Sequence, residues 1–126
     1  MSENRINSFE DLECWKACRE NRKYVSSIIK KFPEYEKYAL VDGMRRASRS
    51  TTENIAERFG RFHYQENIQF CRISRGSLFE LMDQFITAQD EEYINQEEYK
   101  KGRDILDKAK GLLNGYINYL QKAKGK

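Results

Sequence analysis

Arginines are the side chains of this sequence that are best suited to chemistry with a ligand. Several of them cluster in Met44–Arg61, which reads MRRASRSTTENIAERFGR, and others follow in the next segment. The candidates for ligand contacts are Arg45, Arg46, Arg49, Arg61, Arg72 and Arg75. Because a guanidinium keeps its charge and matches phosphate oxygens in geometry, this cluster favours contacts with nucleic acid.

Local ion pairing is the alternative for the same arginines. Arg49 stands four residues before Glu53, which is the spacing of a pair on one face of a helix. Arg46 could meet an acid on a neighbouring helix. We therefore expect Arg46 and Arg49 to be paired, whereas pairing and phosphate binding are equally consistent with the other four arginines.

Groups that could catalyse a reaction are few. The single histidine, His63, falls in an expected turn, whereas a di-iron bundle would need Glu-x-x-His on two helices. Cys14, Cys18 and Cys71 lack CxxC spacing and lie on or beside apolar stripes, where thiols are normally inert. No Walker-type or GxGxxG phosphate loop occurs in the sequence. We therefore predict no enzymatic activity, no cofactor and no metal site.

The composition is typical of a soluble domain built from amphipathic helices. The 126 residues are 39% hydrophobic and 34% charged. No apolar run approaches the roughly 20 residues that span a bilayer, so we expect no membrane segment. The first residues, MSENRINSFEDLE, contain no apolar stretch of the kind found in signal peptides, so we expect a cytoplasmic protein.

The net charge of +3 does not by itself identify a polyanionic partner, but the charges are unevenly distributed. Residues 80–98 contain seven acids and no base, whereas residues 100–126 contain eight bases against Asp104 and Asp107. This asymmetry could serve a partner or form an ordinary solvated surface, and we favour the second interpretation.

The hydrophobic periodicity predicts four helices joined by short turns. Their expected ranges are about 9–31, 34–59, 64–89 and 95–122. One proline, the absence of Asn-Gly or Asp-Gly pairs and the lack of period-two alternation argue against a sheet. We therefore predict an all-α protein with one domain, residues 1–126, folded as an antiparallel up-down-up-down four-helix bundle.

Local signals mark the ends of these helices. Ser8 with Asp11, and Asn95 with Glu98, have the spacing of capping boxes at the starts of the first and last helices. Pro33 closes the first helix, because the residue before a proline is disfavoured in the α region, and it suits the first turn of the next.

The second helix is expected to bury a narrow stripe that includes small residues. The stripe contains Val41, Met44, Ser48, Thr51, Ile55 and Phe59. The matching stripe of the first helix carries Arg22 near its middle, where a leucine would be expected. Because an unpaired buried charge is costly, Arg22 must reach past the seam to water or meet a carboxylate, for which Glu57 and Glu80 are candidates. We favour the first outcome.

The third helix carries more apolar surface than one seam requires. Ile68, Phe79 and Ile86 form a second stripe about 100° from its core face. A monomer would expose this stripe, so we predict that these three residues form a subunit interface of a homo-oligomer. The alternative is that the fourth helix covers them.

The order of four segments resembles a known family. These are FEDLECW, KKFPEYEKYAL, MRRASRSTTENIAERFGR and FCRISRGSLFELMDQF. They are similar to the bacterial four-helix bundle proteins first noticed as products of intervening sequences in 23S ribosomal RNA genes, often labelled S23 ribosomal protein-like. The resemblance extends from Phe9 to about Leu120. The label does not establish a ribosomal role.

The family pattern combines an arginine-alanine pair, a serine, NIAEG, a following arginine and GSxxEL. The matching residues are Arg46, Ala47, Ser50, Asn54, Ile55, Ala56, Glu57, Gly60, Arg61, Gly76, Ser77, Glu80 and Leu81. Arg58 replaces the glycine of NIAEG, which suggests that the second helix continues past it and is capped at Gly60. Asn21 and Arg22 replace residues that are usually apolar in relatives.

The resemblance implies properties beyond the fold. The sequence is also similar to the accessory protein of diversity-generating retroelements, which forms a basic five-membered ring and engages a reverse transcriptase and nucleic acid. The resemblance thus implies a homo-oligomer, a pentamer, with RNA or DNA and a reverse transcriptase or other protein as possible partners. The competing hypothesis is a protein–protein scaffold without nucleic-acid binding.

The polar residues of the family motif have a structural interpretation. Asn54 and Glu57 on the second helix, with Ser77 and Glu80 on the third, can hydrogen-bond across the contact and fix its register. A functional pocket formed by these four residues, or simple exposure, is the alternative.

Tyrosines could stack on unpaired bases. Tyr24, Tyr35 and Tyr38 are the more exposed of the eight, and we expect them to serve packing.

Overall fold

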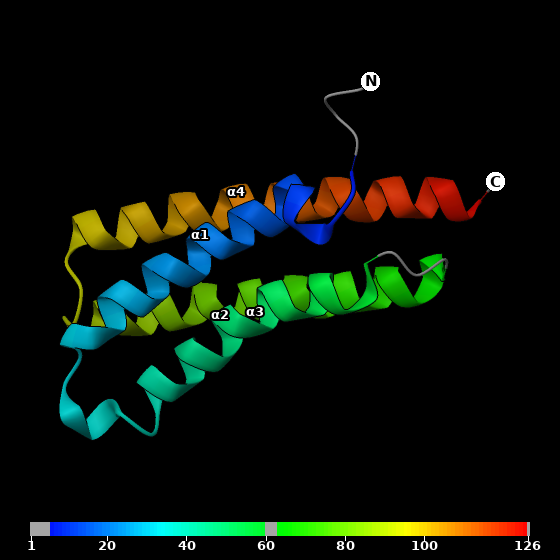
Figure 1. Cartoon of the computed structure of the whole chain (residues 1–126). Helices are drawn as coiled ribbons and strands as arrows, with labels where there is room; N and C mark the ends of the chain where they lie inside the picture. The colour runs from blue at the N-terminus through cyan, green and yellow to red at the C-terminus, as the bar shows by residue number, and fades with distance from the viewer. Residues whose placement is uncertain (1–5, 60–62, 126) are drawn as a thin grey trace.

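The computed structural model describes residues 6–59 and 63–125. Its elements are η1 (Phe9–Asp11), α1 (Glu13–Ile28), η2 (Ile29–Lys31), η3 (Glu34–Glu36), α2 (Leu40–Arg58), α3 (Tyr64–Asp90) and α4 (Gln96–Lys124), where η denotes a 3-10 helix. In Figure 1, α1 and α4 form one layer of the bundle and α2 and α3 the other. Each α-helix packs against two of the others, α1 and α3 both contacting α2 and α4. The predicted all-α, antiparallel four-helix bundle is confirmed.

The first helix starts with the predicted capping box but is not continuous. The backbone N–H of Glu10 donates to Ser8 Oγ (3.2 Å), and that of Ser8 donates to Asp11 Oδ2 (3.1 Å). Leu12 is then extended, with ψ at 128°, so α1 begins only at Glu13. The side chain of Leu12 is buried by this break. The last turn of the predicted helix is the 3-10 helix η2.

Helix α2 begins at Leu40, six residues later than expected. Residues 34–39 read EYEKYA and offer no aliphatic side chain to the core, so packing does not draw them into the helix. A single 3-10 turn forms there instead, and the carboxylate of Glu36 accepts from the backbone N–H of Leu40 (3.2 Å). At the other end α2 stops at Arg58, with Phe59 as its extended C-cap. Gly60, the predicted cap, lies outside the described residues.

The core is formed by buried apolar side chains from all four α-helices. Its largest fully buried members include Met44, Ile55, Leu78, Phe85 and Leu113. Gly102 of α4 has a packing role, because a Cβ there would lie 3.1 Å from the rings of both Phe85 and Tyr24. The capping box at the start of α4 is present, with both of its hydrogen bonds.

The middle of α1 contains a buried polar residue that the sequence pattern did not single out as a core position. Asn21 is fully buried, and neither polar atom of its amide has a hydrogen-bond partner among residues 6–59 and 63–125. Arg22 lies beside it at the edge of the core, half-buried, and donates from Nη1 to Thr52 Oγ1 of α2 (2.9 Å). Arg22 forms no ion pair with Glu57 or Glu80, which are both exposed.

Two tyrosines of the helices are not fully buried. Tyr64, at the start of α3, is exposed. On α4, Ile117 is buried, whereas the neighbouring Tyr116 is only half-buried.

Among the helices of residues 6–59 and 63–125, none is both long and apolar enough to cross a membrane.

Candidate nucleic-acid interface

A shallow groove between α1 and α2 gathers four cationic side chains. Its volume is about 180 Å³, which suits a phosphate group and a few waters better than a drug-sized molecule. Arg22 and Lys23 line it from α1, and Arg45 and Arg49 line it from α2. The other lining residues are apolar or carry a hydroxyl, namely Val25, Ser26, Ile29 and Ser48. We call this site the basic groove.

The two helices hold these side chains by their spacing and by one cross-helix bond. Arg45 and Arg49 are four residues apart, so they project from the same side of α2 one turn apart. The bond from Arg22 to Thr52 fixes the guanidinium of Arg22 against α2. Thr52 can accept this bond because its own hydroxyl donates to the carbonyl of Arg49 (3.2 Å). The groove therefore has one anchored cation and three that can adapt to a ligand.

The charges of the basic groove are largely uncompensated. Within the described part of the chain, no carboxylate lies within 4.0 Å of Arg22, Arg45 or Arg49. Lys23 has one long contact of 4.0 Å with Glu20, and both side chains are exposed. The predicted ion pair of Arg49 with Glu53 does not form, so the guanidinium of Arg49 remains available to an anion. An exposed ion pair at this spacing would in any case contribute little to stability.

The other predicted arginines lie elsewhere. Arg46 is paired, as expected, but with Asp42 one turn earlier on α2 (3.1 Å) and not with a neighbouring helix. Arg75 of α3 donates to Asn114 Oδ1 of α4 (2.8 Å). Arg72 lines a separate groove of about 320 Å³ between the start of α3 and the end of α4. Arg61 lies outside the described residues.

Sequence reasoning missed two members of the basic groove. Arg22 was interpreted only as a packing problem within the seam of the first helix, and Lys23 was not considered. Arg22 and Lys23 lie beside α2 because of the way in which α1 packs against that helix. The available signal was the Arg22-Lys23 pair on a helix predicted to pack against the arginine-rich segment.

The polar motif residues cross-link α2 to α3 through a serine that had no assigned role. Ser77 Oγ donates to Ser50 Oγ (2.9 Å), and Asn54 Nδ2 donates to the carbonyl and the hydroxyl of Ser50 (2.8 and 2.9 Å). Ser74 Oγ adds a bond to the carbonyl of Thr51 (2.9 Å). Asn54 and Ser77 thus meet through Ser50.

The two carboxylates of the same motif are not part of this network. Glu57 and Glu80 are exposed, and neither hydrogen-bonds across the contact between α2 and α3. Gly76 is exposed as well, and a Cβ added to it would meet no atom within 4 Å. The motif therefore combines a structural cross-link with side chains on the surface.

The predicted interface stripe on α3 is only partly exposed. Ile68 is 2% exposed and belongs to the core, which corrects its assignment to a subunit interface. Phe79 is 51% exposed and Ile86 is also exposed, as predicted for a surface stripe. Lys110 of α4 lies 5.2 Å from the centre of the Phe79 ring. Ile73, which the sequence analysis did not include, is a further exposed apolar residue of α3.

The three cysteines are free and buried. Burial raises the pKa of Cys14, Cys18 and Cys71 to about 12 each. Their thiols are thus protonated at neutral pH, and a thiol is a much weaker nucleophile than a thiolate. The described residues contain no group of three or more histidine, cysteine, aspartate or glutamate side chains arranged to hold a metal.

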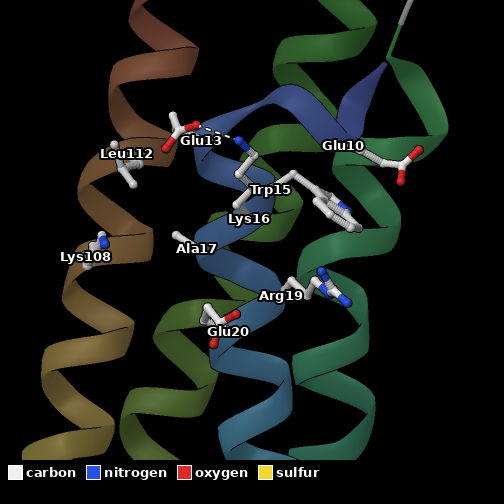
Figure 2. Close-up of a pocket in the computed structure, with 9 residues that line it drawn as sticks. All are labelled: Glu10, Glu13, Trp15, Lys16, Ala17, Arg19, Glu20, Lys108 and Leu112. Atoms are coloured by element: carbon white, nitrogen blue, oxygen red, sulfur yellow. Dashed lines mark hydrogen bonds and ion pairs between the residues drawn. The ribbon is translucent and has the colours of Figure 1, made fainter. Parts of the chain in front are cut away.

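A depression of about 340 Å³ lies against the first half of α1, but its charged side chains do not form a cluster of one sign. Figure 2 shows Trp15 and Arg19 on one side of α1, and Lys108 and Leu112 of α4 on the other. Acidic and basic side chains alternate around it, and the dashed contact in the figure is the ion pair of Glu13 with Lys16. Compared with this depression, the basic groove is the better anion site.

Comparison with known proteins agrees with the architecture. Residues 10–115, which are most of the chain, match a protein family described as 23S rRNA-intervening sequence protein. No curated protein matches the chain.

Proposed function

The chain belongs to the 23S rRNA-intervening sequence protein family, and we propose that it is a non-catalytic, oligomeric protein that binds RNA or DNA through the basic groove. One observation carries the proposal: four cationic side chains line this groove and no carboxylate does. Electrostatic contacts of this kind supply most of non-specific nucleic-acid binding.

Oligomerisation strengthens a weak site. A net charge of +3 gives a single chain little overall attraction for a polyanion. Copies of the basic groove in one assembly would act together, because the second contact occurs at high effective concentration. The exposed apolar residues of α3 (Ile73, Phe79 and Ile86) support such an assembly. A pentamer is the symmetry that resemblance to the retroelement accessory protein suggests.

The same resemblance suggests the setting of the proposed function. It favours a bacterial cytoplasmic protein with structured RNA, or a reverse transcriptase with its nucleic acid, as partners. The alternative function is a scaffold that binds only proteins. The exposed stripe on α3 is as consistent with binding another protein as with self-association. Measuring nucleic-acid binding therefore decides between the two functions.

The proposed function is tested by fluorescence anisotropy of labelled structured RNA over a series of salt concentrations. We expect binding that weakens as salt rises. The double variant Arg45→Gln/Arg49→Gln should weaken binding at least about 10-fold and reduce the slope of log K against log salt by about 1.4 to 1.8, from two lost phosphate contacts. The charge-matched control Arg46→Gln/Lys100→Gln removes two exposed cations that already have acidic partners. Absence of binding at low salt, or equal losses in both variants, would refute the proposal.

The oligomer is tested by light scattering. The unmodified protein should have a mass that is a multiple of 15.0 kDa, and Phe79→Asp should lower it. Lys100→Asp, on the exposed surface of α4, is the control for adding an acidic residue. A monomeric unmodified protein would remove the oligomer from the proposal.

A further inference from the structure

Two exposed tyrosines lie in the connection between the two helices that line the basic groove. Tyr35 is 76% exposed and Tyr38 is 86% exposed, so the expectation that they serve packing is wrong. Tyr24, by contrast, is half-buried and its ring lies 6.4 Å from that of Phe85. Residues 32–39 connect the two helices that flank the basic groove, in cyan in Figure 1. Both exposed tyrosines therefore belong to the segment that joins the two walls of the groove.

The ring of Tyr35 is held in place from its polar end. Its hydroxyl is 2.9 Å from the hydroxyl of Tyr93, which in turn donates to Glu36 Oε2 (2.8 Å). The Tyr93 ring meets Tyr35 edge-on, with centroids 6.5 Å apart. A ring whose hydroxyl is anchored and whose surface is exposed loses little conformational freedom when another ring stacks on it.

Cations continue from the basic groove to these rings. Ile29 lines the groove, and the exposed Lys30 follows it directly on the chain. At the other side of the turn, Lys37 Nζ lies 5.5 Å from the centre of the Tyr38 ring, and its one ion contact among the described residues is a long, exposed one with Glu34 (3.9 Å). From Arg22 to Ile29 the groove side of α1 spans about 10 Å, at the usual helical rise per residue. The cations of the groove and the two exposed tyrosines thus follow one another along the chain.

The chemistry around the rings distinguishes a nucleic-acid base from a protein surface. A protein-docking patch combines aromatic with aliphatic side chains, as the exposed stripe of α3 does. Residues 30–39 expose no large aliphatic side chain, and lysines accompany the tyrosines there. Exposed aromatic rings next to a basic groove are the arrangement with which proteins bind single strands.

We propose that the ligand of the basic groove is a single-stranded nucleic acid whose phosphates lie along the groove and whose bases stack on Tyr35 and Tyr38. This inference rests on the proposed function, since it specifies the ligand of the same site. A duplex keeps the faces of its bases stacked inside, so only unpaired bases can use these rings. Each stacked base should contribute about 5- to 100-fold in affinity.

The test compares a labelled 12-nucleotide single strand of mixed sequence with the same strand in a duplex. The unmodified protein should bind the single strand more tightly. Tyr35→Ala/Tyr38→Ala should weaken single-strand binding at least about 10-fold, leave duplex binding unchanged and keep the salt slope, because no phosphate contact is lost. Tyr35→Phe/Tyr38→Phe keeps both rings and removes only their hydroxyls, including the one that anchors Tyr35, so it should lose clearly less affinity than the alanine variant, after circular dichroism has established that both variants are folded.

The outcomes separate this inference from the proposed function. If the alanine variant binds the single strand as the unmodified protein does, while Arg45→Gln/Arg49→Gln loses binding, the stacking inference is wrong and the proposed function stands. Duplex binding that equals single-strand binding would also overturn the inference. If neither nucleic acid binds at low salt, both proposals fail.

Discussion

Helix α2 has polar side chains on both of its contacts, but only the contact with α1 includes cations that have no carboxylate partner among the described residues. Toward α3, Ser50 accepts from both Ser77 and Asn54, and Ser74 bonds to the carbonyl of Thr51. Toward α1, Arg45 and Arg49 face the basic groove with no carboxylate in reach among the described residues, and Arg22 bonds only to Thr52. Asn21, in the middle of α1, is buried, and its amide has no hydrogen-bond partner in the part of the chain that the structure describes.

This difference indicates what each side does. Buried polar groups that bond to one another specify how two helices align, and they leave nothing over for a ligand. Exposed cations without acidic partners contribute little to folding and keep their charge available. The α2–α3 contact is therefore structural, and the α1–α2 contact is where we place function. Each prediction below changes one side and uses the other as its control.

The largest effect should come from disturbing the α2–α3 contact. Ser74→Leu removes the bond to Thr51 and forces a larger side chain into a fully buried position. Overpacking costs about 1–3 kcal/mol and the lost bond about 1 kcal/mol, so the free energy of unfolding should fall by about 2–4 kcal/mol. Urea denaturation followed by the fluorescence of Trp15, the only tryptophan, measures it.

The matched control makes the same substitution on the other side. Ser26 lines the basic groove and is exposed. Ser26→Leu should change the free energy of unfolding by less than about 0.5 kcal/mol. Equal destabilisation by the two variants would mean that the contacts of α2 are equally tight, and the comparison would fail.

The sequence predicted the features that depend on local spacing. Ser8 with Asp11 and Asn95 with Glu98 act as caps because each bond joins residues three or fewer positions apart. The buried stripe of α2 from Val41 to Ile55 follows from helical periodicity in the same way, whereas Phe59, its expected last member, is the half-buried C-cap. These signals are sufficient for the four-helix architecture.

Features that depend on how the helices cross could not be predicted in this way. Ile68 and Phe79 lie on similar faces of α3, but eleven residues separate them, about 16 Å along the helix. Ile68 lines a groove together with Gln121 and Lys124 from the end of α4, whereas the neighbour of Phe79 on α4 is Lys110. One angular stripe thus has two environments. The bonds of Ser50 with Ser77 and of Arg22 with Thr52 could not be predicted for the same reason, because each of them joins two helices.

A smaller effect of opposite sign is expected from removing the unpaired amide of α1. Asn21→Leu has nearly the same size and replaces two unsatisfied polar atoms with apolar ones. An unpaired buried polar group costs about 1–3 kcal/mol, so the free energy of unfolding should rise by about 1–2 kcal/mol. The same urea titration measures the change.

Asn54→Leu is the control on the α3 side, because the amide of Asn54 is bonded to Ser50. This variant should lower the free energy of unfolding by about 0.5–1.5 kcal/mol. A loss of stability in Asn21→Leu as well would mean that the amide of Asn21 is satisfied in solution, and the α1 side would then be as well bonded as the α3 side.

The smallest effect should come from the one bond that ties the basic groove together. Thr52→Val keeps the shape of a buried side chain and removes the acceptor of Arg22. Because the half-exposed guanidinium can turn to water, the loss of stability should be about 1 kcal/mol or less. Binding to the single strand should weaken about 2- to 5-fold, since Arg22 is no longer held beside Arg49. Thr87→Val removes a comparable hydroxyl that bonds only within α3 (Asp83 carbonyl, 3.2 Å) and should leave affinity unchanged. If the two variants bind alike, Arg22 has no part in the groove's function, and the site reduces to the cations of α2 and Lys23.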